Sequence, residues 1–529
     1  MFLGNCFLNF QLAFYFLIYA MANKVSSLSV VGLNVKPVRV EIDLDPGLHN
    51  FRIVGLADKA VEESRERVGA AVKASGAKPP QRFNRKIIVN LAPADLKKQG
   101  PAFDLPIAVA FLIASDQINF KARPDLVFAG ELALDGSLCS VQGVLAMAIY
   151  AQRHDLILVI PKENKAEASL VKDLKIIASD SLKDLVLKLE KNTAAAVEVG
   201  DGIPKNFAGV LKSDFDMGFI RGQEQAKRAL EIAAAGGHHI LLHGSPGSGK
   251  TILSRAMPTI LPPMSEDETL EVTKIWSVAG LLHAERPLIL ERPFRTPHHS
   301  ASLVSIIGGG TSPRPGEISL AHRGVLFLDE FPEFPRSILE ALRQPLEDGE
   351  VTVARAKETV LFPARFSLVA AQNPCPCGNL GDQEVPCVCS SGDIMKYKRK
   401  ISGPILDRID INVSVPRVSF EKLRGSDSES SQDIRLRVIV ARKLQEERFS
   451  ASKIHTNAEM STRQINSFCK LNRESEQILK RAHDKFHLSP RGHNRILKVA
   501  RTISDLAGEE NIGPGHIAEA VHYRHNDTD

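Results

Sequence analysis

A glycine-rich stretch in the middle of the chain carries the clearest chemistry. It follows a short apolar run at residues 240–242 and precedes a stretch with helical spacing. In the pattern G-x-x-x-x-G-K-[ST], the glycines let backbone N–H groups face a phosphate chain, the lysine supplies a cation and the hydroxyl binds Mg²⁺. The pattern therefore predicts a site for ATP with Mg²⁺. It is filled by Gly244, Ser245, Pro246, Gly247, Ser248, Gly249, Lys250 and Thr251.

Two acidic residues follow a second apolar run. Residues 325–328 are all large and apolar, and they end in Asp329 and Glu330. A buried strand of a parallel sheet delivers such carboxylates to the edge where a phosphate loop lies. We expect Asp329 to hold Mg²⁺ together with Thr251, and Glu330 to orient and deprotonate the attacking water. These residues predict hydrolysis of ATP to ADP and phosphate.

Four of the seven cysteines fall within fifteen residues of one another. They form two C-x-C pairs, and four thiolates in one loop can close a tetrahedral Zn²⁺ site. The more usual spacing leaves two residues between paired ligands, so buried reduced thiols are the alternative. Seven cysteines are too few for a disulfide scaffold in a chain of 529 residues, which favours a reducing compartment, the cytoplasm. The four are Cys375, Cys377, Cys387 and Cys389.

The first twenty residues differ from everything after them. Residues 1–20 contain no charged side chain and are rich in Phe, Leu and Tyr. Their length is close to a bilayer span, but no basic residue precedes the apolar run and no small-residue cleavage site closes it. We expect an over-extended translation start, with the protein beginning near Met21. A membrane anchor is the alternative.

The remaining chain divides by pattern into three domains, as its length suggests. Residues 21–190 alternate strands and helices and predict an α/β domain, and residues 191–207 predict a linker. Residues 208–420 predict an α/β domain with a parallel sheet around the phosphate loop. Residues 421–529 carry helical spacing and predict a helical lid. The hydrophobic content of 43% is ordinary for a globular protein, and the net charge of +5 permits a DNA partner without requiring one.

A third apolar run, residues 366–371, ends at Gln372 and Asn373. Together with the two earlier runs it resembles the AAA+ ATPases, which implies that Asn373 touches the γ-phosphate and the attacking water. Residues 403–410 resemble the arginine-finger motif of the Mg-chelatase and MCM branch of that superfamily. This resemblance implies that Arg408 reaches the nucleotide of a neighbouring subunit and that the chain works as a ring. An Asp–Arg surface pair is the alternative.

Two arginines in the C-terminal part compete for one role. The segment Ser489-Pro490-Arg491 opens a predicted helix and resembles the sensor-2 motif of the same branch. The resemblance implies that Arg491 contacts the γ-phosphate of its own subunit. Arg495, one turn later, is the alternative, and the sequence does not decide between them.

Two further segments suggest contact with DNA. Residues 347–353 and 360–362 predict a hairpin with Asp348-Gly349 in its turn, and it resembles the pre-sensor hairpin of related motors; a plain hairpin at a sheet edge is the alternative. A basic cluster follows the cysteines and favours a DNA channel, although a solvated basic loop explains it nearly as well. The cluster comprises Lys396, Lys398, Arg399 and Lys400, with Tyr397 among them.

Six segments together resemble the ComM/YifB family of Mg-chelatase-like bacterial ATPases. The resemblance spans nearly everything after Met21 and is carried by residues 51–56, 63–68, 90–95, 295–302, 373–378 and 403–410. It implies a hexameric ring that hydrolyses ATP and acts on single-stranded or branched DNA, in branch migration during natural transformation or homologous recombination. Recombination proteins are implied as further partners.

In the N-terminal domain, residues 130–132, Gly136 and residues 159–164 resemble the Lon-protease domain, which has the ribosomal-S5-like fold. Peptide hydrolysis on that fold needs a serine nucleophile beside an activating lysine, but Ala102 and Leu145 stand in those places. We expect a non-proteolytic scaffold. Two other functions stay open: a magnesium-chelatase motor subunit, against which this front domain argues, and an assembly scaffold or remodeller that does not translocate DNA.

Overall fold

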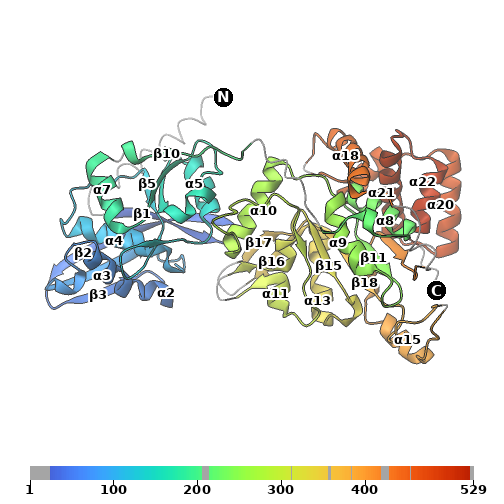
Figure 1. Ribbon diagram of the computed structural model, residues 1–529, viewed down its shortest axis with the longest axis horizontal. Helices are drawn as coiled ribbons and strands as arrows, with labels where there is room; N and C mark the ends of the chain where they lie inside the picture. Colours follow the sequence, from blue (N-terminus) through green and yellow to red (C-terminus); the bar gives the residue numbers. More distant parts are fainter. Residues whose placement is uncertain are drawn as a thin grey trace. The chain divides into compact units, whose positions relative to one another are not determined.

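The computed structural model describes residues 24–192, 194–204, 214–310, 313–354, 359–382, 384–418, 428–452 and 454–524 (Figure 1). Contacts divide the chain into two compact units. The first comprises Met1–Phe207 with Thr273–Ile289, and the second comprises Ala208–Val272 with Leu290–Asp529. The apolar segment 1–20 and parts of the linker and lid boundaries fall outside the described residues. Within the described ranges, no helix has the length and apolar character that crossing a bilayer requires.

The first unit is built on an eight-stranded mixed sheet in the order β10-β9-β8-β5-β1-β2-β4-β3. Strand β4 alternates buried and more exposed residues, whereas β8 is buried along its whole length, as its continuous apolar sequence predicts. The strands are β1 (Lys24–Val31), β2 (Asn34–Pro46), β3 (Asn50–Val54), β4 (Arg85–Ala92), β5 (Leu126–Phe128), β8 (Ile157–Pro161), β9 (Lys175–Ser179) and β10 (Glu198–Val199).

Helices pack on this sheet and complete the expected α/β arrangement. Helix α4 is apolar on nearly every side, and all but one of its residues are buried, because the helix is covered all round. The helices are α2 (Lys59–Glu62), α3 (Ser64–Ala74), α4 (Asp104–Ala114), α5 (Val144–Arg153), α6 (Lys165–Ala168) and α7 (Leu182–Asn192), with the short pair β6 (Glu131–Leu132) and β7 (Leu138–Cys139) beside them.

The second unit contains a five-stranded sheet whose neighbouring strands all run parallel. Its order is β12 (Phe294–Arg295), β15 (Val325–Leu328), β18 (Ser367–Gln372), β11 (Ile240–His243) and β19 (Ile411–Ser414). Strands β11, β15 and β18 are buried along nearly their whole length, which explains why three continuous apolar runs predicted them correctly. The carboxyl ends of β11, β15 and β18 meet at one edge.

The C-terminal helices share one compact unit with this sheet. Helices α18 and α21 pack on α8, and their apolar faces join the core that includes β11, while α22 packs on α21 and α20 packs on α22 (Figure 1). The predicted helical character of the C-terminal region is therefore confirmed. The helices of this unit are α8 (Glu224–Gly236), α9 (Lys250–Ile260), α10 (Glu266–Ala279, which ends in the first unit), α11 (Leu303–Ile307), α12 (Glu317–Leu320), α13 (Arg336–Ala341), α14 (Arg343–Asp348), α15 (Ser391–Lys398), α16 (Gly403–Leu406), α18 (Ser431–Arg448), α19 (Thr462–Phe468), α20 (Arg473–Phe486), α21 (Pro490–Ala507) and α22 (Pro514–His522).

The predicted turn at Asp348-Gly349 is wrong. Asp348 is the last residue of α14, and Gly349 caps that helix with φ +69°. A glycine in the left-handed conformation is a common helix end, and the Asp-Gly pair does not distinguish it from a hairpin turn. The hairpin itself exists one step later, with β16 (Glu350–Ala354) antiparallel to β17 (Thr359–Pro363). Its connection, residues 355–358, lies outside the described residues.

Candidate nucleotide site

The phosphate loop joins β11 to the first turn of α9 at the carboxyl edge of the parallel sheet. Two of its glycines are required by the geometry. A Cβ on Gly244 would lie 2.1 Å from the carbonyl oxygen of Val415, and Gly249 has φ +97°. Both conditions exclude a side chain, so the loop can turn tightly at the helix N-terminus where phosphate binds.

The side chain of Lys250 points back into this loop. Its Nζ donates to the carbonyl oxygens of Gly244 (2.7 Å) and Ser245 (3.0 Å) and to Oδ1 of Asn373 (3.2 Å). Burial lowers the pKa of Lys250, although the Asp329 carboxylate acts in the opposite direction. In the described part of the chain, the buried hydroxyl of Ser248 has no hydrogen-bond partner. A desolvated ammonium group held only by neutral acceptors and an unused donor both suit an anion such as the ATP phosphates.

Thr251 and Asp329 lie within hydrogen-bond distance of each other. Oγ1 of Thr251 donates to Oδ2 of Asp329 at 2.9 Å. A hydroxyl and a carboxylate at the end of a phosphate loop are the oxygen ligands that Mg²⁺ takes. A magnesium ion held there would neutralise the charge of the β- and γ-phosphate oxygens of bound ATP. The predicted pair is thus placed together.

Glu330 is held in an unusual backbone conformation. Its φ is +51°, in the left-handed region that non-glycine residues rarely occupy, and its N–H donates to Oδ1 of Asp329 at 3.0 Å. Its Oε2 lies 3.2 Å from Nδ1 of His299, which follows β12. Strain of this kind aims a side chain away from the path of the strand. About half of the Glu330 side chain is exposed, so a water molecule can reach its carboxylate.

His299 is a residue that sequence reasoning did not assign. It lies in the segment 295–302 that contributed to the family resemblance, but no role was attached to it. A polar residue just beyond an edge strand that faces the carboxylate of the neighbouring strand is the signal that would have identified it. Asn373 completes the edge, since its Oδ1 accepts from Lys250.

The two predicted arginines share one partner in this structure. The Arg408 side chain is 4% exposed, donates to the Pro404 carbonyl oxygen at 2.6 Å and lies 2.5 Å from Oε2 of Glu347. The Arg491 side chain is 62% exposed and lies 3.4 Å from Oε1 of the same carboxylate. Arg408 lowers the pKa of Glu347. The predicted contacts of both arginines with nucleotide stay predictions.

Arg495, the alternative to Arg491, is engaged elsewhere. It donates to the carbonyl oxygen of Arg408 at 2.6 Å and pairs with Asp410. Asp410 is buried, also accepts from the backbone N–H of His239 at 3.2 Å, and lies 3.3 Å from Nδ1 of His238. Despite its burial, Arg495 and the histidines hold the pKa of Asp410 well below its usual range. This network ties α21 to the sheet, so Arg495 has a structural position and Arg491 has the freer side chain.

The basic cluster at the C-terminal end of α15 and just beyond it is exposed, with one exception. Lys396, Lys398, Arg399 and Lys400 are exposed, whereas Tyr397 is buried. Burial raises the pKa of Tyr397 to about 12. The tyrosine therefore packs against the protein and is not available to stack on a base. The four predicted cysteine ligands also lie together, with their sulfur atoms all within 4.8 Å of one another.

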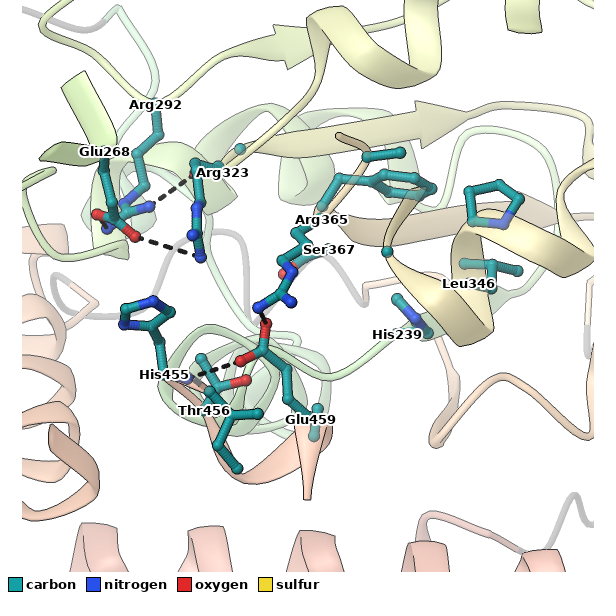
Figure 2. A pocket seen from close by; sticks show the side chains of 18 of the residues that line it. His239, Glu268, Arg292, Arg323, Leu346, Arg365, Ser367, His455, Thr456 and Glu459 are labelled. Carbon is teal, nitrogen blue, oxygen red and sulfur yellow. Dashed lines mark hydrogen bonds and ion pairs between the residues drawn. The ribbon is translucent and has the colours of Figure 1, made fainter. Parts of the chain in front are cut away.

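A cavity of about 220 Å³ lies at the opposite edge of the parallel sheet (Figure 2). Its wall includes residues just before β11, β15 and β18, so it faces away from the phosphate loop. Arg292 donates to Glu268 at 2.9 Å, and Arg365 donates to Glu459 at 3.3 Å. These guanidinium groups are already paired, and this cavity is not the nucleotide site.

In the first unit, neither position that would carry a protease dyad has a reactive side chain. Ala102 lies in the short turn before α4, and its carbonyl oxygen accepts from the N–H of Gly130 at 3.0 Å. Leu145 lies in α5 and is fully buried. An apolar side chain at each place provides neither nucleophile nor base.

Three family models cover most of the chain. The model described as "Magnesium chelatase, subunit ChlI" matches residues 216–423, "Subunit ChlI of Mg-chelatase" matches residues 40–164, and "Magnesium chelatase, subunit ChlI C-terminal" matches residues 428–524. The first covers the phosphate loop, Asp329, Glu330, Asn373 and Arg408, and the third covers Arg491.

Comparison with curated proteins separates two groups of relatives. The chain is 44% identical over 506 residues to "Competence protein ComM" of Haemophilus influenzae, covering 94% of this chain and 97% of that protein. It is 39% identical over 503 residues to "Uncharacterized protein YifB" of Escherichia coli, covering 94% and 96%. The match to "Magnesium-chelatase 38 kDa subunit" of Cereibacter sphaeroides is 29% over 180 residues, covering 31% and 54%. The chain therefore belongs to the ComM/YifB family of Mg-chelatase-like AAA+ ATPases.

Proposed function

We propose that this ATPase is a ring-shaped motor that moves DNA, with branch migration or helicase action in homologous recombination or natural transformation. The observation that carries the proposal is the group of five polar side chains gathered at one sheet edge, in a chain similar over 94% of its length to a competence protein. The group consists of Lys250, Thr251, Asp329, Glu330 and Asn373. We place the protein in the cytoplasm, where its DNA substrate is found.

Each member of this group has a defined task in ATP hydrolysis. Lys250 binds the terminal phosphates, and Thr251 with Asp329 fixes the magnesium ion. Glu330 accepts a proton from the attacking water, and its contact with His299 holds the carboxylate in place before the phosphate arrives. Asn373 links the terminal phosphate to β18, the central strand of the sheet.

The exposed cations of α15 support a DNA partner. Lys396, Arg399 and Lys400 line an open groove together with residues 332–334 and 336, which lie a few positions after Glu330 in the chain. Lys400 lies 2.7 Å from the Glu333 carboxylate. Because phosphate contacts are electrostatic and independent of sequence, this surface fits a motor that slides along DNA. Because residues 332–334 lie only a few positions after Glu330, they offer a short route along the chain between DNA contact and hydrolysis.

The ring follows from the role we assign to Arg408. An arginine that completes a neighbour's site couples hydrolysis to assembly, because turnover waits for the second subunit. Arg408 must then leave Glu347 when subunits pack. We propose a hexamer, with Arg491 contacting the nucleotide of its own subunit.

A branch-migration assay tests the proposal. The purified chain is given ATP, Mg²⁺ and a synthetic four-way or three-stranded junction, with Glu330→Gln as the inactive control. We expect the junction to be converted into its branch-migration products only when hydrolysable ATP is present. The reaction should be lost when Lys396 and Arg399 are both changed to Glu. Active ATPase that neither moves the junction nor responds to DNA contradicts the proposal.

A magnesium-chelatase motor subunit is the second candidate, because all three matching family models carry that description. Such a subunit drives a partner and has no need for DNA. ATP turnover that is unchanged by single-stranded or branched DNA would favour this candidate or an assembly scaffold.

A further inference from the structure

Four cysteine sulfurs converge on one point beside the nucleotide site. Sγ of Cys375 lies 3.4 Å from Sγ of Cys377 and 3.6 Å from Sγ of Cys387, and Cys377 and Cys387 are also 3.6 Å apart. Cys389 joins them, with all four sulfurs within 4.8 Å. Thiolates around a tetrahedral Zn²⁺ at about 2.3 Å lie about 3.8 Å from one another. A disulfide bond would need about 2.05 Å. The spacing fits a metal and does not fit a bridge.

A backbone amide also points at one of these sulfurs. The N–H of Cys377 donates to Sγ of Cys389 at 3.4 Å. An N–H donor of this kind supports a sulfur ligand of a metal. The contact ties the chain of the first C-x-C pair to a sulfur of the second.

The loop that carries the cysteines has little else to hold it. Between β18 and α15, from residue 373 to residue 390, its described residues form no helix or strand. Cys375 is the one core residue among them, while Val385 and Val388 are exposed. Buried reduced thiols would require an apolar pocket around all four, and three of the four are only partly buried. A segment without a hydrophobic core of its own needs another source of stability, and a bound metal provides it.

This loop forms part of the surroundings of the phosphate loop. A Cβ on Gly378 would lie 2.5 Å from Cδ of Pro246, so the two segments touch. The carboxylate of Asp382 in this loop lies 2.9 Å from Nε of Arg417. Residues 374, 380 and 381 line a cavity of about 250 Å³ together with Gly244 and Ser245. The cysteine-bearing loop therefore forms one wall of this cavity, beside the phosphate loop.

We propose that Cys375, Cys377, Cys387 and Cys389 bind a structural Zn²⁺ that fixes this wall against the phosphate loop. All four coordination positions are taken by protein sulfur, so the ion has no open position for catalysis. Its effect is on nucleotide binding, through Pro246 and Ser245. The metal site does not depend on DNA being the substrate; its link to ATP rests on the nucleotide site described above.

Metal analysis of the purified, reduced full-length chain tests the site. We expect about one zinc ion per chain, falling below about a tenth in the double variant Cys377→Ser/Cys389→Ser. Cys139→Ser, at a cysteine outside the cluster, is the matched control and should keep its zinc. If the double variant does not fold, the wild-type stoichiometry decides alone. Wild-type protein with less than about 0.2 zinc per chain overturns the proposal.

A binding measurement tests the link to the nucleotide. Zinc is removed with a zinc-selective chelator while Mg²⁺ stays in excess, and ATP affinity is measured without DNA. We expect Kd to rise about tenfold and to recover when Zn²⁺ is restored. An unchanged Kd in protein that has lost its zinc refutes the link. Because DNA is absent, this outcome is independent of the branch-migration assay.

Discussion

Changing Glu347 to glutamine should separate the structural position of Arg408 from its proposed action on a neighbouring subunit. Arg408 is almost fully buried, and Glu347 is the carboxylate that lies 2.5 Å from it. The substitution removes the negative charge while keeping the shape of the side chain. If Arg408 serves only to pair with Glu347, the two residues should show the same defects. If it acts in trans, they should differ.

The size of the stability effect follows from the burial of the two partners. Breaking a fully buried pair and leaving one charge costs about 3–5 kcal/mol. Glu347 is 42% exposed, and glutamine keeps an acceptor, so we expect about 1–2 kcal/mol after allowing for solvent screening. For a unit of this size that lowers Tm by about 2–8 °C. Combining Glu347→Gln with Arg408→Ala should give a coupling of about 1 kcal/mol.

Thermal unfolding without nucleotide and phosphate release with nucleotide measure the two effects. Glu347→Gln should melt earlier yet keep kcat within about threefold, whereas Arg408→Ala should lose about 10³-fold in kcat. Glu350→Gln, an exposed glutamate nearby, is the matched control and should change neither. Equal losses of turnover in Glu347→Gln and Arg408→Ala would refute the trans role. So would failure of Arg408→Ala and Lys250→Ala subunits to recover any activity when mixed.

Three further predictions concern the nucleotide site and its support. Lys250→Ala should weaken ATP binding by about 10²–10³-fold, because about 3–4 kcal/mol of charge-assisted hydrogen bonding is lost; titration with a fluorescent nucleotide checks this, and a change under threefold contradicts it. Glu330→Gln should bind ATP normally but slow its hydrolysis by about 10²-fold or more, seen as ATP retained on the protein; near-normal turnover would remove Glu330 from its role as base. Asp410→Asn should cost about 3 kcal/mol, a Tm fall of about 6–12 °C. Since the folded pKa of Asp410 lies below its ordinary value of 3.8, its contribution is complete above pH 3.8 and is lost as the pH falls further, so wild type and variant should converge in acid.

The parts of the site that the sequence predicted are those with a local signature. The phosphate loop needs glycines at fixed positions, and the buried strands of a parallel sheet must be apolar on both faces. Those two demands located Lys250, Asp329 and Asn373 at one edge, where the structure brings them together. The expected α/β and helical regions are also present, because the hydrophobic periodicity that predicted them is a local signature as well.

Features set by distant contacts were not predictable. His299 meets Glu330 only because β12 lies next to β15 in the sheet. Tyr397 is buried although its neighbours are exposed, which a basic run does not reveal. The sequence did not decide between Arg491 and Arg495 as the sensor. The structure pairs Arg495 with Asp410, which is far away in the chain. In each case the deciding partner comes from another element.

The division of the chain into units has a practical consequence. Residues 273–289 belong with the N-terminal unit, where Ser277 hydrogen-bonds to Glu167 and its carbonyl oxygen accepts from the N–H of Gly143 at 3.2 Å. The polypeptide passes from one unit to the other three times. After a protease cut between residues 204 and 214, the C-terminal fragment therefore still contains residues 273–289, which belong to the N-terminal unit. Shortening the gene to residues 208–529 would strand Ser277 and its neighbours in solvent. In an ATPase fragment designed to fold on its own, residues 273–289 should therefore be replaced by a short polar linker.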